Sequence, residues 1–495
     1  MVDKDSTGFA DLEKLNRWRR YQATLSFVLC AAVKKICPQA RVRIEHSISN
    51  GLYFMIDENI TYSGMRSLET VMKEIINQGH QIRKKVYPKT KARAIFVRHG
   101  QKDKVHLIEN TPRQNVAVYS LLGIHDTYAV PPFDSTSSVP LFGIERFSPG
   151  FILMLPTWHD LSTIPAYTPQ PKLARIFNEY ENWAHILGID TVGELNQSIK
   201  KGRGPEIVKV SEALHEKKIV YIADRIVRER ERLVLVAGPS SAGKTTFTKR
   251  LSIQLLVNGI TPLIISSDDY FLPHSQTPRD ASGQMDFESI HAVDIPLLND
   301  HLWKIIEGQE VTLPRFNFHT GRRNKGEKVA LPENGVILLE GIHCLNETLT
   351  YKIPKPIKFK IYVSALTQLN IDDHNRISTT DTRMLRRITR DTKFRGYNIL
   401  GVLERWSRVR CGEERNVYPF QEESDEMFNS ALIYEPSIMR KSCLSLLRRV
   451  KKKHPAYEET KRLSDFLDLF VDLEERDIPS NSILCEFIGG SSFVY

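Results

Sequence analysis

The sequence predicts an α/β protein with a parallel sheet in its second half, preceded by a separate α+β region. Two observations predict the sheet. Residues Gly238–Thr245 read Gly-Pro-Ser-Ser-Ala-Gly-Lys-Thr, the G-x-x-x-x-G-K-[ST] pattern of a phosphate-binding loop. From residue 231 onward, apolar strands alternate with helical segments, and the strands are predicted at 233–237, 262–266, 336–340 and 358–363.

The pattern before the loop changes twice along the chain. Residues 11–36 and 67–78 have a helical period, and 42–44 and 52–56 have the character of strands. Residues 172–230 are predicted to form helices joined by glycine-rich turns. We therefore expect four parts: an α+β domain over 1–165, a helical linker over 166–230, a phosphate-loop domain over 231–430, and a helical extension packing on it over 431–495.

Composition favours a protein of a reducing compartment that binds polyanions. The 495 residues carry a formal net charge of +10, and none of the six cysteines forms a C-x-x-C pair. The start of the chain lacks the features of a signal peptide, and no apolar run is long enough to span a bilayer. We expect a cytoplasmic protein with free thiols and no membrane partner.

The surroundings of the loop support its interpretation as a nucleotide site. The apolar strand 233–237 leads into it, and the amphipathic helix 246–257 leads out. Lys244 can reach the terminal phosphates of ATP, and the Thr245 hydroxyl can bind Mg²⁺. We expect the nucleotide to contact Gly238, Pro239, Ser240, Ser241, Ala242, Gly243, Lys244, Thr245 and Thr246.

Acidic residues follow two further strands. Asp268 comes after the strand at 262–266, where it could accept a proton from an attacking hydroxyl or help to hold Mg²⁺. The alternative is that Asp268 only caps a helix. Glu340 ends the strand at 336–340, in the position expected for a Walker B residue that binds Mg²⁺ directly or through water.

An arginine-rich helix is predicted over 381–396. At helical spacing Arg383, Arg387 and Arg390 share one face, which could close over a triphosphate as a lid. The alternative is a solvated basic helix.

These motifs, in this order, resemble those of the uridine kinase and phosphoribulokinase family over residues 231–430. The resemblance implies a kinase fold of the P-loop NTPase class and transfer of the γ-phosphoryl of ATP to a hydroxyl. It implies that Asp268 is the general base, that Lys244, Thr245 and Glu340 handle phosphates and Mg²⁺, and that Arg387, Arg390 and Arg395 belong to the lid. Lys244, Arg387 and Arg390 would join Asp268 in catalysis, and Arg395 would also contact the nucleotide.

The acceptor side departs from that family. His291 stands where an aspartate binds ribose hydroxyls, and Phe316 and Gly321 replace the tyrosine and histidine that read the pyrimidine. We name Asp268, Tyr270, His291, Phe316 and Arg383 as candidate substrate residues. The leading hypothesis is a nucleoside kinase of nucleotide salvage acting on a uridine- or cytidine-like acceptor. Two alternatives stay open: a kinase for a phosphosugar or pantothenate-like molecule, and an ATP-binding regulator that docks RNA or tRNA.

Two other regions carry resemblances. Segments within 410–430 and 481–490 resemble a subgroup of bacterial-type nucleoside kinases with an added amino-terminal domain. Residues 31–38, 48–54 and 107–112, together with Tyr119, give the stretch over about 20–160 a resemblance to the editing-type second domain of threonyl-tRNA synthetase. The metal-ligand positions of that fold fall on Ala23, Phe27, Ala129 and Phe133, none of which can bind a metal, so we expect no editing chemistry.

We therefore expect the amino-terminal domain to have a regulatory, dimerising or RNA-docking role. The basic stretch from Arg83 to Lys104 could contact RNA phosphates, although a solvated face is the commoner meaning of such a stretch. The expected partners are ATP and a small hydroxyl-bearing substrate, with a second copy of the chain in a homo-oligomer. Nucleic acid enters this expectation only through the amino-terminal domain.

Overall fold

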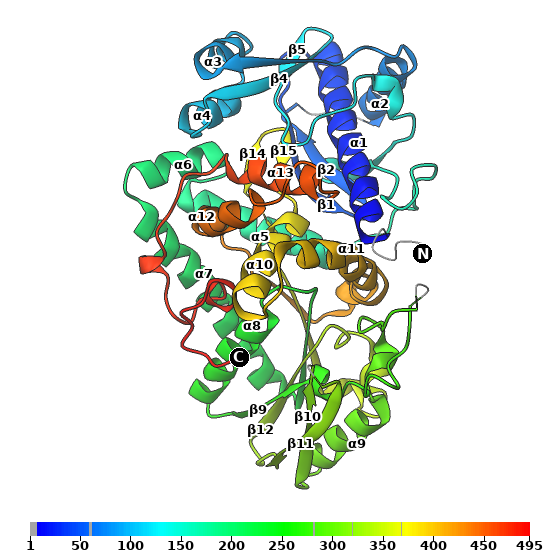
Figure 1. The fold of residues 1–495 in the computed structure, drawn as a ribbon, viewed down its shortest axis with the longest axis vertical. Helices are drawn as coiled ribbons and strands as arrows, with labels where there is room; N and C mark the ends of the chain where they lie inside the picture. The colour runs from blue at the N-terminus through cyan, green and yellow to red at the C-terminus, as the bar shows by residue number, and fades with distance from the viewer. Residues whose placement is uncertain (1–6, 59–61, 281–282, 319, 368) are drawn as a thin grey trace.

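A computed structural model describes residues 7–58, 62–280, 283–318, 320–367 and 369–495. Figure 1 shows the amino-terminal elements at one end of the molecule and the parallel sheet toward the other, with helices α10 (Thr379–Phe394) and α11 (Ile399–Asn416) between them. Within the ranges described, no helix has both the length and the apolar character needed to cross a membrane.

Five strands form the parallel sheet, in the order β16-β13-β8-β12-β9. All four neighbouring pairs are parallel. The four strands predicted from the sequence are confirmed, whereas the four-residue β16 is too short to stand out as an apolar run. The strands are β8 (Leu233–Ala237), β9 (Thr261–Ser266), β12 (Gly335–Glu340), β13 (Lys358–Ser364) and β16 (Glu426–Asn429).

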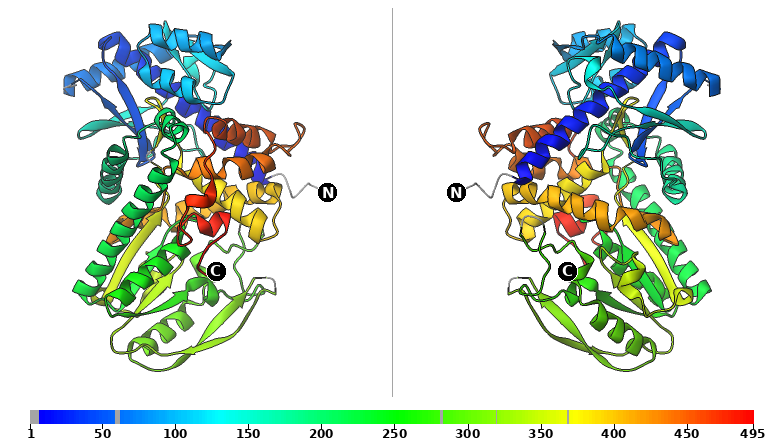
Figure 2. Two further views of the ribbon diagram at one scale, coloured as in Figure 1. Left: turned by 90° about the vertical axis from the view of Figure 1, so that its left-hand side faces the viewer. Right: turned by 90° about the vertical axis from the view of Figure 1, so that its right-hand side faces the viewer.

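Helices cover both faces of this sheet, as the continuous apolar run of β8 requires. Val234 and Val236 pack against α7 (Gly204–Glu229) and α8 (Lys244–Val257). Leu233 and Leu235 point to the other face, into a core shared with α5 (Pro171–Leu187) and α9 (Ile295–Ile306). An antiparallel hairpin of β10 (Val311–Asn317) and β11 (Arg322–Val329) lies at the far end of the molecule (Figure 2).

The amino-terminal region contains two antiparallel sheets, in the orders β1-β2-β7-β6 and β3-β4-β5. Helix α1 (Thr7–Ile36) forms a core with the first of these sheets and with α2 (Tyr62–Asn77). The helices and strands predicted in this region are confirmed. The remaining elements are β1 (Val42–Ile48), β2 (Gly51–Ile56), β3 (Arg83–Pro88), α3 (Lys89–Arg98), α4 (Lys102–Asn110), β4 (Asn115–Leu121), β5 (Ile124–Asp126), β6 (Gly143–Phe147) and β7 (Gly150–Met154).

Carboxyl-terminal helices join the two ends of the molecule. Glu459 of α13 (Tyr457–Leu467) accepts a hydrogen bond from Arg19 of α1 at 2.7 Å, and both side chains are buried. The tail reaches the kinase half, where Ile488 O of α14 (Cys485–Ile488) accepts a hydrogen bond from Lys393 of α10 at 2.5 Å. The other helices of these regions are α6 (Val192–Lys200) and α12 (Glu435–Leu447).

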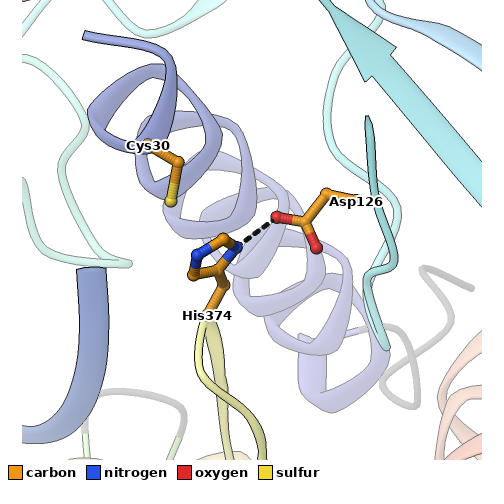
Figure 3. A group of neighbouring side chains, drawn as sticks. All are labelled: Cys30, Asp126 and His374. Carbon is orange, nitrogen blue, oxygen red and sulfur yellow. Dashed lines mark hydrogen bonds and ion pairs between the residues drawn. The ribbon is translucent and has the colours of Figure 1, made fainter. Parts of the chain in front are cut away.

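A buried charge cluster attaches the hairpin of β14 (Asn370–Asp372) and β15 (Asn375–Arg376) to the amino-terminal region. Lys104 Nζ lies 2.7 Å from Asp126 Oδ1 and 2.8 Å from Asp372 Oδ1. His374 Nδ1 lies 2.6 Å from Asp126 Oδ2, with Cys30 of α1 beside it (Figure 3). Burial opposes the charge of Lys104, but the carboxylates raise its pKa well above the ordinary value.

This cluster corrects one expectation from the sequence. Lys104 is completely buried and paired, so it is not available to RNA phosphates. The residues of β3 that begin the same basic stretch, Arg83, Lys84 and Lys85, are exposed. The sequence alone does not distinguish the buried Lys104 from the exposed residues of β3. The two carboxylates that contact Lys104 most closely come from β5 and from the distant hairpin.

Candidate active site

The phosphate-binding loop connects β8 to α8 at the carboxyl edge of the sheet. Gly243 caps α8 with φ +84°, a left-handed conformation that favours glycine. Lys244 Nζ donates hydrogen bonds to the carbonyl oxygens of Gly238 at 2.9 Å and Pro239 at 3.2 Å. The ammonium group is therefore held across the loop, where it adds to the positive end of α8 and favours a bound phosphate.

The adjacent strand β12 brings a carboxylate to the same loop. Thr245 Oγ1 donates to Glu340 Oε1 at 3.1 Å. The other oxygen, Oε2, is buried and has no hydrogen-bond partner among the described residues. Burial raises the pKa of Glu340 to about 7, although Lys244 opposes the shift. An unpartnered carboxylate oxygen beside a threonine hydroxyl fits a Mg²⁺ site.

Asp268 follows β9, the strand next to β12. The Ser266 hydroxyl accepts the hydrogen bond from the Asp268 amide and caps the short helix, so the capping role considered for Asp268 belongs to Ser266. Asp268 is exposed at the end of β9. Desolvation by the surrounding protein raises its pKa, while the positive charges of Lys244 and Arg395 lower it. Its carboxylate is placed to take a proton next to the loop.

The arginine helix α10 packs against the phosphate-binding loop. Arg383 Nε donates to Ser240 O at 2.9 Å, and Arg387 donates to Ser240 Oγ at 2.9 Å. Arg386, which no motif in the sequence marks, is fully buried and pairs with Glu435 at 2.6 Å. These contacts contradict the alternative of a solvated basic helix.

Arg383 is corrected from a substrate residue to a brace of the loop. It is fully buried and forms an ion pair with Glu413 of α11, which in turn accepts a hydrogen bond from Ser240 N at 2.7 Å. Its guanidinium therefore has no free face for an acceptor. Arg390 Nε donates to Asp391 at 2.9 Å, and half of the Arg395 side chain is exposed.

The acceptor candidates Tyr270, His291 and Phe316 differ in their exposure. Tyr270 is fully buried, with its hydroxyl 3.1 Å from His301 Nδ1, so this placement argues against a substrate role for it. His291 is exposed. Phe316 on β10 is buried in an aromatic group, with ring centroids 5.8 Å from Phe271 and 5.0 Å from Phe318.

His274 supplies an imidazole that the sequence argument missed. Gly321 has φ +64°, and a Cβ at this position would overlap the His274 ring. The ring centroid of His274 lies 5.5 Å from that of Phe287 and 6.1 Å from that of Phe316. A histidine from another segment thus occupies the space beside Gly321.

Comparison with known proteins identifies the region that carries this geometry. Residues 233–432 match the sequence profile of the "Phosphoribulokinase / Uridine kinase family". Residues 233–432 form a domain of this kinase family. Membership implies the use of ATP and Mg²⁺ by this kinase domain.

Curated relatives and a solved structure match the same part of the chain. A uridine kinase of Deinococcus deserti is 27% identical over 210 residues, which cover 42% of this chain and 92% of the relative. A uridine kinase of Halobacterium salinarum is 27% identical over 191 residues, covering 38% and 76%. A solved structure of a possible uridine kinase from Bacillus stearothermophilus is 16% identical with a TM-score of 0.30, covering 43% of this chain and 98% of that one.

A second carboxyl group, that of Glu288, lies near Asp268 and Arg387 in the kinase domain. Burial, together with the nearby carboxylates of Glu413 and Asp268, raises its pKa to about 7, although Arg387 opposes the shift. The family resemblance points to His291, three residues later, and not to Glu288. Glu288 instead faces the catalytic candidates.

The carboxyl-terminal tail also contacts the kinase domain at the phosphate-binding loop. Thr246 Oγ1 donates to Glu486 at 2.8 Å and lies 2.8 Å from the Tyr495 hydroxyl. Glu486 also faces Arg390 of the arginine helix at 3.8 Å. No local signal marks this contact, because the two partners are some 240 residues apart in the chain.

The positions compared with synthetase metal ligands hold apolar groups. Ala23 and Ala129 line a cavity between the amino-terminal region and the kinase domain. Phe27 is buried with its ring centroid 5.4 Å from that of Tyr128, and the Phe133 ring lies 4.6 Å from the Arg20 guanidinium. These four side chains offer no ligand atom for a metal.

Proposed function

We propose that this protein transfers the γ-phosphoryl group of ATP to a hydroxyl of a nucleoside of the uridine or cytidine kind. One observation carries the proposal: the phosphate-binding loop, Glu340 and Asp268 follow three neighbouring parallel strands, β8, β12 and β9. The carboxyl ends of neighbouring parallel strands meet at one edge of the sheet, so the proposed sites for the ATP phosphates, for Mg²⁺ and for the general base lie together there.

Each residue then has a physical role. Asp268 takes the proton of the attacking hydroxyl as the new phosphorus–oxygen bond forms. Lys244, Arg387 and Arg390 supply positive charge around the transferred phosphoryl group. Thr245 and Glu340 would hold Mg²⁺, which neutralises charge on the phosphates when bound. Arg383 and Arg386 keep the arginine helix against the loop.

The acceptor pocket is proposed beside Asp268, at the base of the β10–β11 hairpin. The rings of Phe271, Phe287, Phe316 and Phe318 suit a flat base, and His274 offers a hydrogen-bonding group beside Gly321. Because most of this lining is apolar, we expect modest discrimination among flat or sugar-containing acceptors.

The test is an ATP-consumption assay of the full chain with Mg²⁺, against nucleosides, phosphosugars, and vitamin precursors such as pantothenate. The Lys244→Ala variant is the blank, and Lys249→Ala on the same helix is the matched control. We expect uridine or cytidine to stimulate turnover most. If a phosphosugar or pantothenate does so, the nucleoside assignment is wrong, and if no hydroxyl acceptor raises turnover, the kinase proposal fails.

A further inference from the structure

A cavity of about 350 Å³ lies between the amino-terminal region and the kinase domain, outside the active site. We call it the interlobe cavity. Its walls come from α1, β1, the segment from Arg376 to Asp381, and the kinase elements β13 and α11. Its volume is within the range of small-molecule sites, about 300–1,000 Å³.

Arg376 is the one arginine of this cavity whose guanidinium has no hydrogen bond or ion pair with any described residue. The other three arginines in the wall are neutralised. Arg462 and Arg19 share Asp381, with Arg462 at 2.7 Å and Arg19 at 3.4 Å, and both also pair with Glu459. Arg410 lies 3.4 Å from Glu414. Burial lowers the pKa of Arg376 to about 10, with only Asp381 opposing the shift.

The same wall contains the amino-terminal end of α10, which is 16 residues long. Its cap residue, Ser378, makes no side-chain capping hydrogen bond, and Thr379 and Thr380 line the cavity. The helix dipole therefore adds partial positive charge close to Arg376. His46 adds no positive charge, because burial and the charge of Arg376 lower its pKa to about 3.

Part of the cavity wall is aromatic. The His46 ring stacks on Phe177 with centroids 3.7 Å apart, and it also stacks on Tyr53 at 4.8 Å. Tyr362 and Phe177 line the cavity itself. A cavity with one unpaired cation and an aromatic wall suits an organic anion that carries a flat group.

We propose that the interlobe cavity binds a small phosphomonoester, with its phosphate on Arg376 and the start of α10 and its organic part against Phe177 and Tyr362. The site has a direct connection to the loop, because α10 begins in the cavity and its next turns carry Arg383 and Arg387, which bind Ser240. A ligand there is placed to change kinase turnover, and this regulatory part rests on the function proposed above.

Binding is tested by calorimetry on the full chain, with Mg²⁺ and a non-hydrolysable ATP analogue present to fill the phosphate-binding loop. The probes are inorganic phosphate, ribose 5-phosphate and uridine 5′-monophosphate. We expect affinity to rise in that order because only the last reaches the aromatic wall. Arg376→Met should weaken the best probe by about 10- to 100-fold, as loss of a charged hydrogen bond does. Arg376→Lys should weaken it less.

Two controls make the result decisive. Arg228→Gln, at an exposed position of α7, should bind the probe as the wild type does. Without a probe, Arg376→Met should melt no lower than the wild type, because it removes a partly buried, unpaired charge. Unchanged binding by Arg376→Met, or no binding of any probe by the wild type, would overturn the site.

The regulatory part has its own readout. Turnover of ATP with the best acceptor should change when the best probe is added to the wild type and stay constant in Arg376→Met. Binding that depends on Arg376 without any change in turnover would leave the site standing and reject the regulation. Absence of kinase turnover in every variant would instead reject the function proposed above and leave the binding result unaffected.

Discussion

Thr245 Oγ1 lies 3.1 Å from Glu340 Oε1, so the end of the phosphate-binding loop and the end of β12 meet at one point. The second oxygen of Glu340 is buried without a partner among the described residues, and burial raises the pKa of this carboxyl to about 7. An unpartnered carboxylate oxygen beside a threonine hydroxyl fits a Mg²⁺ ligand set. The affinity of the site for Mg²⁺ should therefore depend on pH.

The first prediction concerns that dependence. Because the raised pKa means that Glu340 holds a proton below pH 7, Mg²⁺ must displace it, and the apparent affinity should fall by about tenfold per pH unit below 7. Titration of Mg²⁺ by calorimetry between pH 5.5 and 8.5 measures this. Glu340→Gln should bind weakly and with little pH dependence, and a wild-type affinity constant across the range would show that Glu340 is not a ligand.

In the absence of nucleotide and metal, the stability of the fold should decrease as pH rises, whereas the affinity for Mg²⁺ increases. The pKa values of Glu288 and Glu340 are raised to about 7 by burial, so the folded state holds protons that the unfolded chain releases near pH 4.5. Their contribution to the free energy of unfolding is full below pH 4.5 and is lost as pH rises to 7. Each plot of melting temperature against pH is first corrected for other titrating groups with the Glu288→Gln/Glu340→Gln double variant. After this correction, Glu288→Gln and Glu340→Gln should each show a smaller decrease in melting temperature across this range than the wild type.

Asp268 and its neighbour Asp269 should separate catalysis from folding. Asp268→Asn removes the proposed base and should lower kcat by about 100-fold or more, with little change in melting temperature. Asp269 accepts a hydrogen bond from Phe316 N at 3.1 Å, so Asp269→Ala should lower the melting temperature instead. Steady-state kinetics and thermal denaturation of both variants check this. Near-normal kcat in Asp268→Asn would remove it from the base role.

The arginines of α10 and Arg395, the residue that caps its carboxyl-terminal end, should also divide into two classes. Arg383→Met leaves Glu413 buried and unpaired, so it should destabilise the protein by about 3–5 kcal/mol. Arg395→Met should leave stability nearly unchanged, because half of that side chain is exposed, while it weakens ATP turnover. Denaturant unfolding and kinetics measure the two effects. A stable but inactive Arg383→Met would restore its earlier assignment as a substrate residue.

Gly321 tests the proposed position of His274. Gly321→Ala places a methyl group where the His274 ring lies and forces a positive φ on alanine. We expect a higher KM for the acceptor with the KM for ATP unchanged. Gly283→Ala is the matched control, because it also has a positive φ but open space around it. If both variants raise the acceptor KM equally, backbone strain and not His274 explains the effect.

The sequence predicted the parts of the site that depend on local order. The loop lies between a strand and a helix as expected, and Glu340 and Asp268 follow their strands, because strand ends and turns are encoded by neighbouring residues. The order of the strands across the sheet could not be predicted from the sequence. Only the structure shows that β12 lies between β8 and β9 and so brings the three ends together.

Residues whose environment comes from distant segments were harder to interpret. Arg386 was passed over because Glu435 and Ser430, its partners, are more than forty residues away. Tyr270 was named beside Asp268 from its place in the motif, but α9 provides His301 to bury it. His274 and Glu486 were missed for the same reason. Sequence adjacency to a motif does not determine which way a side chain faces.

The central claim is phosphoryl transfer to a small hydroxyl, and ³¹P nuclear magnetic resonance tests it most directly. The full chain is incubated with ATP, Mg²⁺ and the best acceptor of the consumption assay. We predict one phosphomonoester signal that grows in step with ADP and is absent with Lys244→Ala. ADP accompanied only by inorganic phosphate would contradict the claim.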